Sequence, residues 1–289
     1  MSNSFKANLK QVEQIIEYYK EYQDEVTPTN IYFNASTGDF SVLIYSNYTV
    51  LFQGKKASEE ASKWIEITSV SSTYLNTHIG SDEVGCGDYF GPIVVSSALV
   101  NKADIQYLLD IGVKDSKLLN DEKIKELAPI VLSKVKSATF VLSNRKYNEI
   151  RDGYNLNKVK AYLHNFVLSK LVKLTKFNDK IVVDQFCSKD LYYNYLGDYK
   201  RNDIVDNITF ETKAESKYIA VACASIIARY TFLNEIEKLK EKTGYNILLG
   251  ADSKVDLLAR KILLEKGLDY LKNIVKLHFK NTEKIIGNE

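Results

Sequence analysis

The sequence predicts two domains: a small α+β module at the N-terminus and a larger α/β domain in which helices cover a central sheet. Three observations support this prediction. Short β-rich runs lie between two helical patterns in the first 68 residues. The polar stretch 69–76 then has the composition of a linker, and from His78 onward strand-like runs alternate with long helical stretches. A chain of 289 residues can bury one large core and one small one.

The N-terminal module is expected to hold a helix, three strands and a second helix. Apolar residues recur at helical spacing within residues 5–23, and Pro28 prevents that helix from continuing. The strand-like runs are IYFNAS, SVLIYS and TVLFQG, and KASEEASKWIEI follows as the second helix. We therefore assign residues 1–68 to this module, 69–76 to a linker and 77–289 to the larger domain.

The larger domain is predicted from its alternating pattern. Its strand-like runs are IVVSSALV, ATFVLS and KIVVD, and helical patterns cover residues 121–134, 155–174, 216–241 and 253–274. This alternation is typical of an α/β sheet covered by helices. Ala220, Ala224 and Ala228 recur every four residues, which predicts a helix with one face thin enough to pack closely on the sheet.

Composition and charge narrow the class of protein only slightly. Cys86, Cys187 and Cys223 show no CxxC spacing, so free thiols in a reducing cytoplasm are expected, without disulfides or a zinc cluster. No apolar run approaches the roughly 20 residues that a membrane span needs, and the polar start MSNSFKANLK lacks a signal core. Residues 1–70 hold six lysines and nine acids, so the mild basic surplus lies in the remainder of the chain.

The segment HIGSDEVGCGDYFGP, residues 78–92, has the pattern of a metal or ligand site. An apolar strand runs into the adjacent carboxylates Asp82 and Glu83 and then into three glycines. Neighbouring side chains on a regular strand point to opposite faces, so both acids can serve one site only if β geometry breaks right after Asp82. Such a pair suits Mg²⁺ or Mn²⁺, although a solvated acidic turn explains the same pattern.

Two further acids stand at the ends of predicted elements. Asp184 ends the hydrophobic run KIVVD, where open α/β sheets place ligands, or it simply begins a turn. Glu215 lies at or just before the first turn of the helix 216–241, and favourable pairing with the helix N-terminus is by itself the simpler explanation. Spacing alone does not decide the role of either acid.

Four separated motifs match a known family. DEVGCGDYFGP (82–92), DSK (115–117), the strand-end Asp184 and the helix KAESKYIAVACASIIAR resemble type 2 ribonucleases H. Within that family the chain resembles ribonuclease HIII more than ribonuclease HII. The DYFGP continuation, Glu215 where HII has Asp, and the N-terminal module that HII lacks all favour HIII, and KAYLHN and KLHFKNT are similar to it as well.

The resemblance implies a fold, a set of site residues and an activity. The fold is a ribonuclease H-like α/β domain with a mixed central sheet flanked by helices, preceded by a TATA-binding-protein-like domain that binds substrate. Catalytic and metal-binding roles fall on Asp82, Glu83, Asp184 and Glu215, which would hold two Mg²⁺ or Mn²⁺ ions. The expected reaction is endonucleolytic hydrolysis of the RNA strand of RNA–DNA hybrids, leaving 3′-hydroxyl and 5′-phosphate ends.

Five residues are candidates for contact with the substrate. The backbone of Gly85, Cys86 and Gly87 is bare enough to approach the 2′-hydroxyl of RNA. Ribonuclease HII has Arg at the position of Cys86, so a side-chain contact is not carried over to this chain. Ser116 and Lys117 are candidate phosphate contacts, although DSK also suits a polar turn at a helix start.

Aromatic residues in the N-terminal module are a second candidate contact surface. They are Tyr32, Phe33, Tyr45, Tyr48 and Phe52. Some must form the core of so small a module, and an exposed subset beside Lys55 and Lys56 is expected to bind the minor groove of the hybrid. His164 and the other two histidines are interpreted as packing or surface residues, and Cys187 and Cys223 as small core residues.

The chain is expected to act on RNA–DNA hybrid duplexes as a cytoplasmic monomer, without a membrane or an obligate protein partner. Three other functions remain open from the sequence. The enzyme could incise at a single ribonucleotide embedded in DNA, as HII does. The chain could bind hybrids without cutting them, which the presence of all four carboxylates disfavours. It could also be a small-molecule metal hydrolase, although no small-ligand motif supports this.

Overall fold

The structure is a computed structural model that describes all residues except 1, 8, 71–73, 114–118, 152 and 288–289. The chain divides into two compact units, Met1–Thr73 and Tyr74–Glu289. The stretch 69–76 assigned to a linker contains the last residues of helix α2 (Ala57–Val70), together with residues 71–73, which lie outside the described part. Each unit has its own hydrophobic core.

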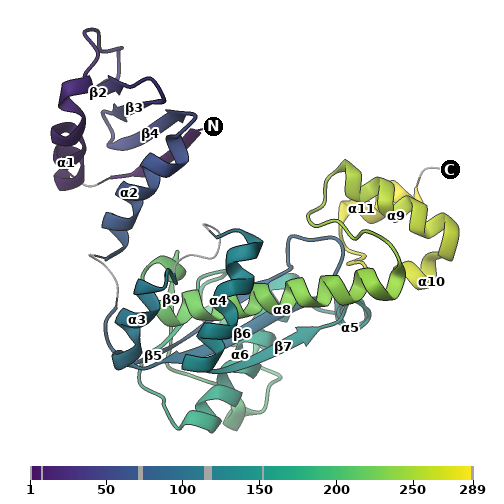
Figure 1. Ribbon diagram of the computed structural model, residues 1–289. Coiled ribbons are helices and arrows are strands. Elements are labelled where there is room, and N and C mark those ends of the chain that lie inside the picture. Colours follow the sequence, from purple (N-terminus) through teal and green to yellow (C-terminus); the bar gives the residue numbers. More distant parts are fainter. Residues whose placement is uncertain (1, 8, 71–73, 114–118, 152, 288–289) are drawn as a thin grey trace. The chain divides into compact units, whose positions relative to one another are not determined.

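The N-terminal unit is a four-stranded antiparallel sheet with two helices (Figure 1). Its elements are β1 (Ser2–Lys6), α1 (Leu9–Tyr19), a 3₁₀ turn (Lys20–Tyr22), β2 (Ile31–Ser36), β3 (Phe40–Tyr45), β4 (Thr49–Gly54) and α2, and the strand order is β1-β4-β3-β2. The sequence predicts the other strands and both helices but not β1, and the helix predicted over 5–23 is wrong at its start, because Phe5 and Lys6 belong to β1 and α1 begins at Leu9. That strand carries a single large apolar residue, Phe5, so its pairing with β4 leaves no hydrophobic pattern to read.

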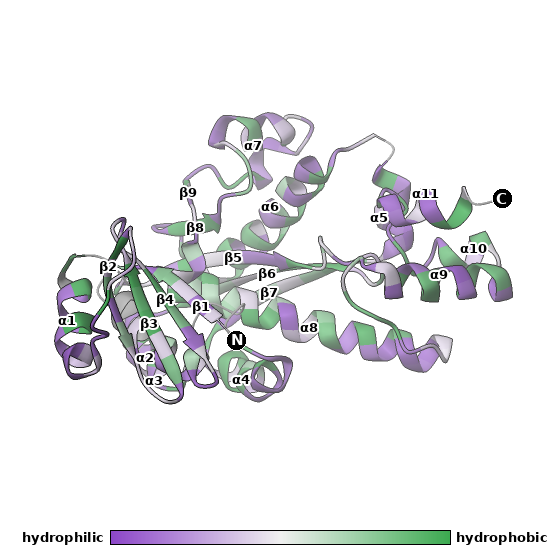
Figure 2. Ribbon diagram, turned by 90° about the horizontal axis from the view of Figure 1, so that it is seen from above, coloured by the Kyte–Doolittle hydropathy of each residue, from purple (hydrophilic) through white to green (hydrophobic). Residues whose placement is uncertain are grey.

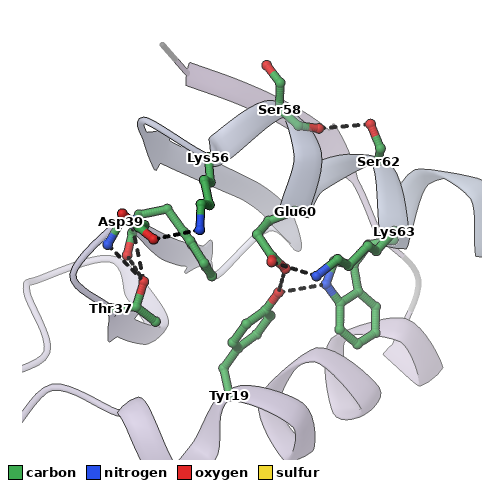
Figure 3. A network of polar contacts seen from close by, with 10 residues as sticks. Tyr19, Thr37, Asp39, Lys56, Ser58, Glu60, Ser62 and Lys63 are labelled. Atoms are coloured by element: carbon green, nitrogen blue, oxygen red, sulfur yellow. Dashed lines mark hydrogen bonds and ion pairs between the residues drawn. The ribbon is translucent and has the colours of Figure 1, made fainter.

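A buried tyrosine joins the two helices of this unit. The Tyr19 hydroxyl, at the end of α1, donates to Glu60 Oε2 at 2.7 Å and accepts from the indole N–H of Trp64 at 3.1 Å. Glu60 also pairs with Lys63 at 2.6 Å (Figure 3). Burial raises the pKa of Tyr19 above its usual range, so the hydroxyl keeps its proton and its role as a donor. These contacts stabilise α1 against α2 across the core.

The C-terminal unit is built around a five-stranded mixed sheet with the order β7-β6-β5-β8-β9. Its strands are β5 (His78–Val84), β6 (Ile93–Val100), β7 (Lys136–Leu142), β8 (Ile181–Asp184) and β9 (Ile208–Glu211). β5, β6 and β7 form antiparallel ladders, whereas β8 pairs in parallel with both β5 and β9. The mixed sheet that the family resemblance implies is therefore confirmed. The short strand β9 is not predicted from the sequence.

Helices cover both faces of this sheet. They are α3 (Ile105–Asp110), α4 (Asp121–Lys134), α5 (Asn144–Arg151), α6 (Leu156–Thr175), α7 (Lys189–Tyr195), α8 (Ile219–Thr243), α9 (Ser253–Lys266), α10 (Leu268–Leu271) and α11 (Lys280–Ile286). Figure 2 shows α8 and α4 on one side of the sheet and α6 and α7 on the other. The single helix predicted over 253–274 is wrong, because Gly267 adopts φ +82° and ends α9 there.

Helix α8 lies closest to the sheet at Gly80 of β5. A Cβ atom at Gly80 would stand 2.3 Å from the Val221 nitrogen and 2.5 Å from the Ala220 carbonyl carbon. Ala220, Ala224 and Ala228 are all fully buried, as their four-residue spacing predicts. The absence of a side chain on β5 and the small side chains on α8 together allow this close packing.

By length and composition alone, α8 is also apolar enough to cross a membrane, and it is the one such helix among the described residues. The expectation that no apolar segment approaches this length is therefore wrong for α8. Within the protein, however, 72% of the most apolar window of α8 is buried, and its side chains form much of the core of the C-terminal unit. This burial is what a core helix requires.

The first residue of β5, His78, holds the start of α8. Its Nδ1 lies 2.7 Å from the Asn76 carbonyl oxygen, and its Nε2 accepts a hydrogen bond from the Ala220 N–H at 3.0 Å. Only the neutral ring with the proton on Nδ1 satisfies both partners. The ring is fully buried, and burial followed by the nearby charge of Lys180 lowers the pKa of His78. Protonation of His78 would put an N–H group on Nε2, which would then face the Ala220 N–H, and the hydrogen bond between them would be lost.

We expect His78 to make the C-terminal unit sensitive to acid. Since its pKa is lowered in the folded state, the folded protein binds fewer protons than the unfolded chain, and stability falls as the pH drops below about 6.5. Urea unfolding followed by circular dichroism should show a larger loss between pH 7.5 and 5.5 for the native protein than for His78→Gln, by about 1 kcal/mol. Equal losses in the two proteins would contradict this assignment.

Candidate active site

Two acids lie side by side where the parallel pairing between β5 and β8 ends. Their ladder pairs Ser81 with Val183, so Asp82 and Asp184 follow on adjacent strands and leave the sheet on the same face. That face carries α8: Asp82 forms a hydrogen bond with the Ser225 side chain of α8. Asp184 Oδ1 accepts a hydrogen bond from the Ala214 N–H, in the turn before α8, at 2.9 Å. This edge of a parallel pair is where α/β sheets bind ligands.

The predicted break in β geometry after Asp82 is wrong. The ladder between β5 and β6 continues regularly, with Glu83 opposite Val95 and Val84 opposite Val94. Only the pairing of β5 with β8 stops, at Ser81. Glu83 therefore leaves the sheet on the opposite face from Asp82, toward α6. The sequence could not show this, because the ladder continues through pairing with β6. That strand follows the glycine loop and returns antiparallel to β5.

On the α6 face, Glu83 contacts two basic side chains that the sequence prediction did not place in the site. One carboxylate oxygen, Oε1, pairs with Lys160, and the other, Oε2, lies 2.8 Å from His164 Nε2. His164 is fully buried, and its Nδ1 lies 2.8 Å from the Ser81 hydroxyl. Lys160 and His164 are four residues apart on α6, a spacing that puts both on one helix face and that could have identified them.

The protein environment shifts the pKa values of the two adjacent acids, Asp82 and Glu83, in opposite directions. Burial raises the pKa of Asp82, and the negative charges of Glu83 and Glu215 raise it further. Burial also opposes ionisation of Glu83, but the His164 hydrogen bond and the charge of Lys160 outweigh it and lower the pKa of Glu83. Asp82 therefore carries unfavourable negative charge, whereas the charge of Glu83 is compensated within the protein.

Glu215 joins the site from a third segment of the chain. It belongs to the 3₁₀ turn Ala214–Ser216, directly before α8, and only 4% of it is exposed. Its charge contributes to the raised pKa of Asp82, which places the two carboxylates near each other. Lys213, just before this turn, adopts φ +54°, and that conformation turns the chain from β9 into α8. The fold thus brings Glu215 to the face that carries Asp82 and Asp184, whereas Glu83, the fourth predicted acid, faces α6.

The chemistry of these donors suits a divalent cation. Carboxylate oxygens are the ligands that Mg²⁺ and Mn²⁺ prefer, and a cation beside Asp82 would relieve the repulsion that raises its pKa. As the side chains stand in the described part of the chain, no three His, Cys, Asp or Glu residues converge closely enough to hold a metal ion. The donor set therefore fits a metal in kind, and binding requires the carboxylates to draw together.

The first two of the three glycines in the loop after β5 have different environments. Gly85 adopts φ +91°, and a Cβ atom there would stand 2.3 Å from the Pro92 carbonyl oxygen, so this residue serves close packing. A Cβ atom at Gly87 would meet no atom within 4 Å, so the backbone of Gly87 is open to an incoming ligand. Cys86 is half-buried between them, and burial raises the pKa of its thiol to about 12. Ser116 and Lys117 lie outside the described residues.

The aromatic residues predicted for the N-terminal surface divide between core and surface. Phe33 and Phe52 are buried, Tyr45 and Tyr48 are half-buried, and 56% of Tyr32 is exposed. The rings of Tyr32 and Tyr48 meet edge to face, with centroids 6.3 Å apart. Lys56 is engaged by Asp39 at 2.8 Å (Figure 3). The three cysteines of the chain are free thiols, as predicted, and Cys223 is a core residue.

Two family models match the chain, and they divide it at nearly the same place as the two compact units. Residues 79–282 match the model described as Ribonuclease HII, and residues 4–74 match a domain of unknown function, DUF3378. Among curated relatives, the ribonuclease HIII of Geobacillus sp. (strain WCH70) is 41% identical over 281 residues, which is 93% of each chain. The ribonuclease HIII of Bacillus cereus (strain AH187) is 38% identical, covering 98% of each chain.

Solved structures give the same result. The Bst-RNase HIII structure in complex with Mn²⁺ aligns with a TM-score of 0.74 at 37% identity, over 99% of this chain and 98% of that one. The ribonuclease H2 of Pyrococcus horikoshii OT3 aligns with a TM-score of 0.62 at 27% identity, but over 72% of this chain. The chain therefore belongs to the ribonuclease HII family and, within it, to the ribonuclease HIII proteins that carry an additional N-terminal domain.

Proposed function

We propose that this chain is a metal-dependent endoribonuclease that hydrolyses the RNA strand of RNA–DNA hybrids. The observation that supports it best is the placement of Asp82, Asp184 and Glu215 on one face, with Glu83 next to Asp82 in the chain but on the α6 face, in a chain of the ribonuclease HIII group. The relative solved with Mn²⁺ supports the use of a divalent metal. We propose Mg²⁺ or Mn²⁺ as the cofactor, two ions per site, and a monomer acting in the cytoplasm.

The carboxylates are proposed to hold the ions and to position the scissile phosphate between them. When bound, divalent ions would supply the positive charge that lowers the pKa of an attacking water and stabilises the leaving 3′ oxygen. Asp82, Asp184 and Glu215 offer oxygens from the α8 side. Glu83 contacts Lys160 and His164 on the α6 face, and it is proposed to offer an oxygen when its side chain turns from that face toward the ions.

No side chain is needed as a nucleophile in this reaction. Ser81, His164 and Glu83 are linked by hydrogen bonds in the order that a serine hydrolase would use. Ser81, however, is fully buried within β5, so its hydroxyl is out of reach of any substrate. Because water attacks the phosphorus and the 3′ oxygen leaves, the phosphate stays on the 5′ oxygen of the downstream fragment, and the products are 3′-hydroxyl and 5′-phosphate ends.

The backbone of the loop Gly85–Gly87 is proposed to recognise the RNA strand. Among the described residues, the N–H groups of Cys86 and Gly87 have no acceptor within the protein, and Gly87 faces open space. An N–H group at this position can donate to the 2′-hydroxyl, which DNA lacks. Ser116 and Lys117 remain proposed phosphate contacts, and the exposed Tyr32 a proposed contact of the N-terminal unit.

A comparison of two substrates tests this function. We expect efficient cleavage of an RNA–DNA hybrid with several consecutive ribonucleotides, and much slower cleavage of a DNA duplex that carries one ribonucleotide. Both are assayed in Mg²⁺ and then in Mn²⁺, with EDTA as the control that abolishes cleavage. Direct ligation of the upstream product would confirm its 3′-hydroxyl end. Efficient cutting at the single ribonucleotide would instead support an HII-like activity.

A further inference from the structure

Lys276 is a buried lysine that the proposed reaction does not use. It lies in KLHFKNT, just before α11, and its side chain is fully buried. Its ammonium lies 2.7 Å from the Asp88 carbonyl oxygen and 2.6 Å from the Gly91 carbonyl oxygen. Burial lowers the pKa of Lys276 to about 8. Within the described part of the chain it forms no ion pair with a carboxylate.

A buried ammonium group lowers the stability of the fold, so its presence at Lys276 calls for a specific role. Removing an ammonium from water costs several kcal/mol, and an apolar residue of similar volume often serves stability as well or better. The two carbonyl groups that receive the ammonium belong to the loop between β5 and β6, residues 85–92. Two inward-pointing carbonyls need donors, and a lysine ammonium has three N–H groups to supply them.

The hydrogen bonds of this loop show that Lys276 anchors its second half, residues 88–91, and not residues 85–87. The Lys276 N–H donates to the Tyr89 carbonyl at 2.9 Å, the Gly91 N–H donates to the Ile274 carbonyl at 3.0 Å, and Asn144 Nδ2 donates to the Gly91 carbonyl at 2.8 Å. Residues 88–91 are therefore bound on several sides. Within the described residues, the one backbone hydrogen bond of residues 85–87 is the long bond from the Asp88 N–H to the Gly85 carbonyl, at 3.4 Å. The anchored half fixes the position of the open half.

We propose that Lys276 is a positioning residue for RNA recognition: through the Asp88 and Gly91 carbonyls it holds the Gly85–Gly87 backbone in place against the ribose of the RNA strand. This inference rests on the proposed function. Lys276 touches neither the substrate nor the carboxylate site, so its loss changes how the loop meets the 2′-hydroxyl. The ions and the acids stay as they are.

Lys276→Met is the variant that tests the inference, because it keeps the length of the side chain and removes all three donors. Binding is measured by fluorescence anisotropy in an Asp82→Asn background, with a labelled RNA–DNA hybrid and with the DNA duplex of the same sequence. We expect hybrid affinity to fall about tenfold, the equivalent of one lost hydrogen-bonded contact, while affinity for the DNA duplex stays nearly constant. In the otherwise native enzyme, KM should rise much more than kcat falls.

Two further variants keep the test decisive. Lys272→Met is the matched control, since that lysine is exposed and its ion-pair partner is the exposed Asp269, and it should leave both affinities unchanged. Asn144→Ala removes a different donor to the Gly91 carbonyl and should reduce discrimination in the same direction, about threefold. If Lys276→Met does not fold, this second variant carries the test.

Each outcome separates this inference from the proposed function. If the native enzyme does not cut hybrids at all, the proposed function fails. If it cuts hybrids and folded Lys276→Met, or Asn144→Ala in its place, still prefers the hybrid over DNA as the native enzyme does, the role of Lys276 is overturned. A purely structural role would lower the melting temperature and weaken both duplexes equally, which also overturns it.

Discussion

Asp82→Asn is expected to reduce hybrid cleavage by about 10³-fold or more, in Mg²⁺ and in Mn²⁺. Asp82 offers its oxygens on the face that carries Asp184 and Glu215, close enough to Glu215 for the two charges to repel. The amide keeps the size of the side chain and an oxygen that can accept from the Glu83 N–H, but it removes the charge that a divalent ion requires. The loss corresponds to about 4 kcal/mol of transition-state stabilisation.

The same substitution should leave the fold intact or stabilise it. Because burial and two neighbouring negative charges raise the pKa of Asp82, its ionised form is unfavourable in the metal-free protein, and a neutral amide removes that repulsion. Asp269→Asn, at a side chain that is 99% exposed, is the control and should change neither activity nor stability. Retention of Mn²⁺-dependent cleavage by folded Asp82→Asn would show that the site lies elsewhere.

Gly80→Ala should be the most destabilising single methyl addition in the C-terminal unit. The new Cβ atom would stand 2.3 Å from the Val221 nitrogen and 2.7 Å from its Cα, and both are backbone atoms of a long buried helix that cannot turn aside. Overpacking of this kind costs about 3 kcal/mol, and separating α8 from β5 would also shift Ser225 away from Asp82. Thermal unfolding should show a fall of several degrees in the melting temperature.

Gly153→Ala is the matched control for this substitution. A Cβ atom at Gly153 meets no atom within 4 Å, and its φ is not in the left-handed region, so stability should change by less than about 0.5 kcal/mol. A Gly80→Ala protein as stable as this control would mean that α8 and β5 do not approach each other as closely as the structure has them.

The sequence predicts most of the elements because their patterns are local. The strands IVVSSALV and KIVVD and the helices around residues 121–134 and 155–174 are found within a residue or two of their predicted positions. Elements without a local pattern are missed. β1 forms by pairing with β4, and β9 forms by pairing with β8. Both are short strands whose partners lie in another segment of the chain, so their own residues carry no clear pattern.

The acid pair Asp82 and Glu83 shows where sequence reasoning ends. The sequence by itself determined the family, the four acids and the glycine loop that follows Asp82 and Glu83, because these are matters of residue type and order along the chain.

Only the tertiary structure decided that β5 continues past Asp82 along β6 and turns Glu83 toward Lys160 and His164. It also decided that Gly85 serves packing while Gly87 faces open space, and that Lys276 holds the loop between β5 and β6. The physical reason is that strand register, burial and hydrogen-bond partners arise between different segments of the chain, from 12 residues apart for Glu83 and Val95 to 81 for Glu83 and His164, and no local pattern encodes such contacts.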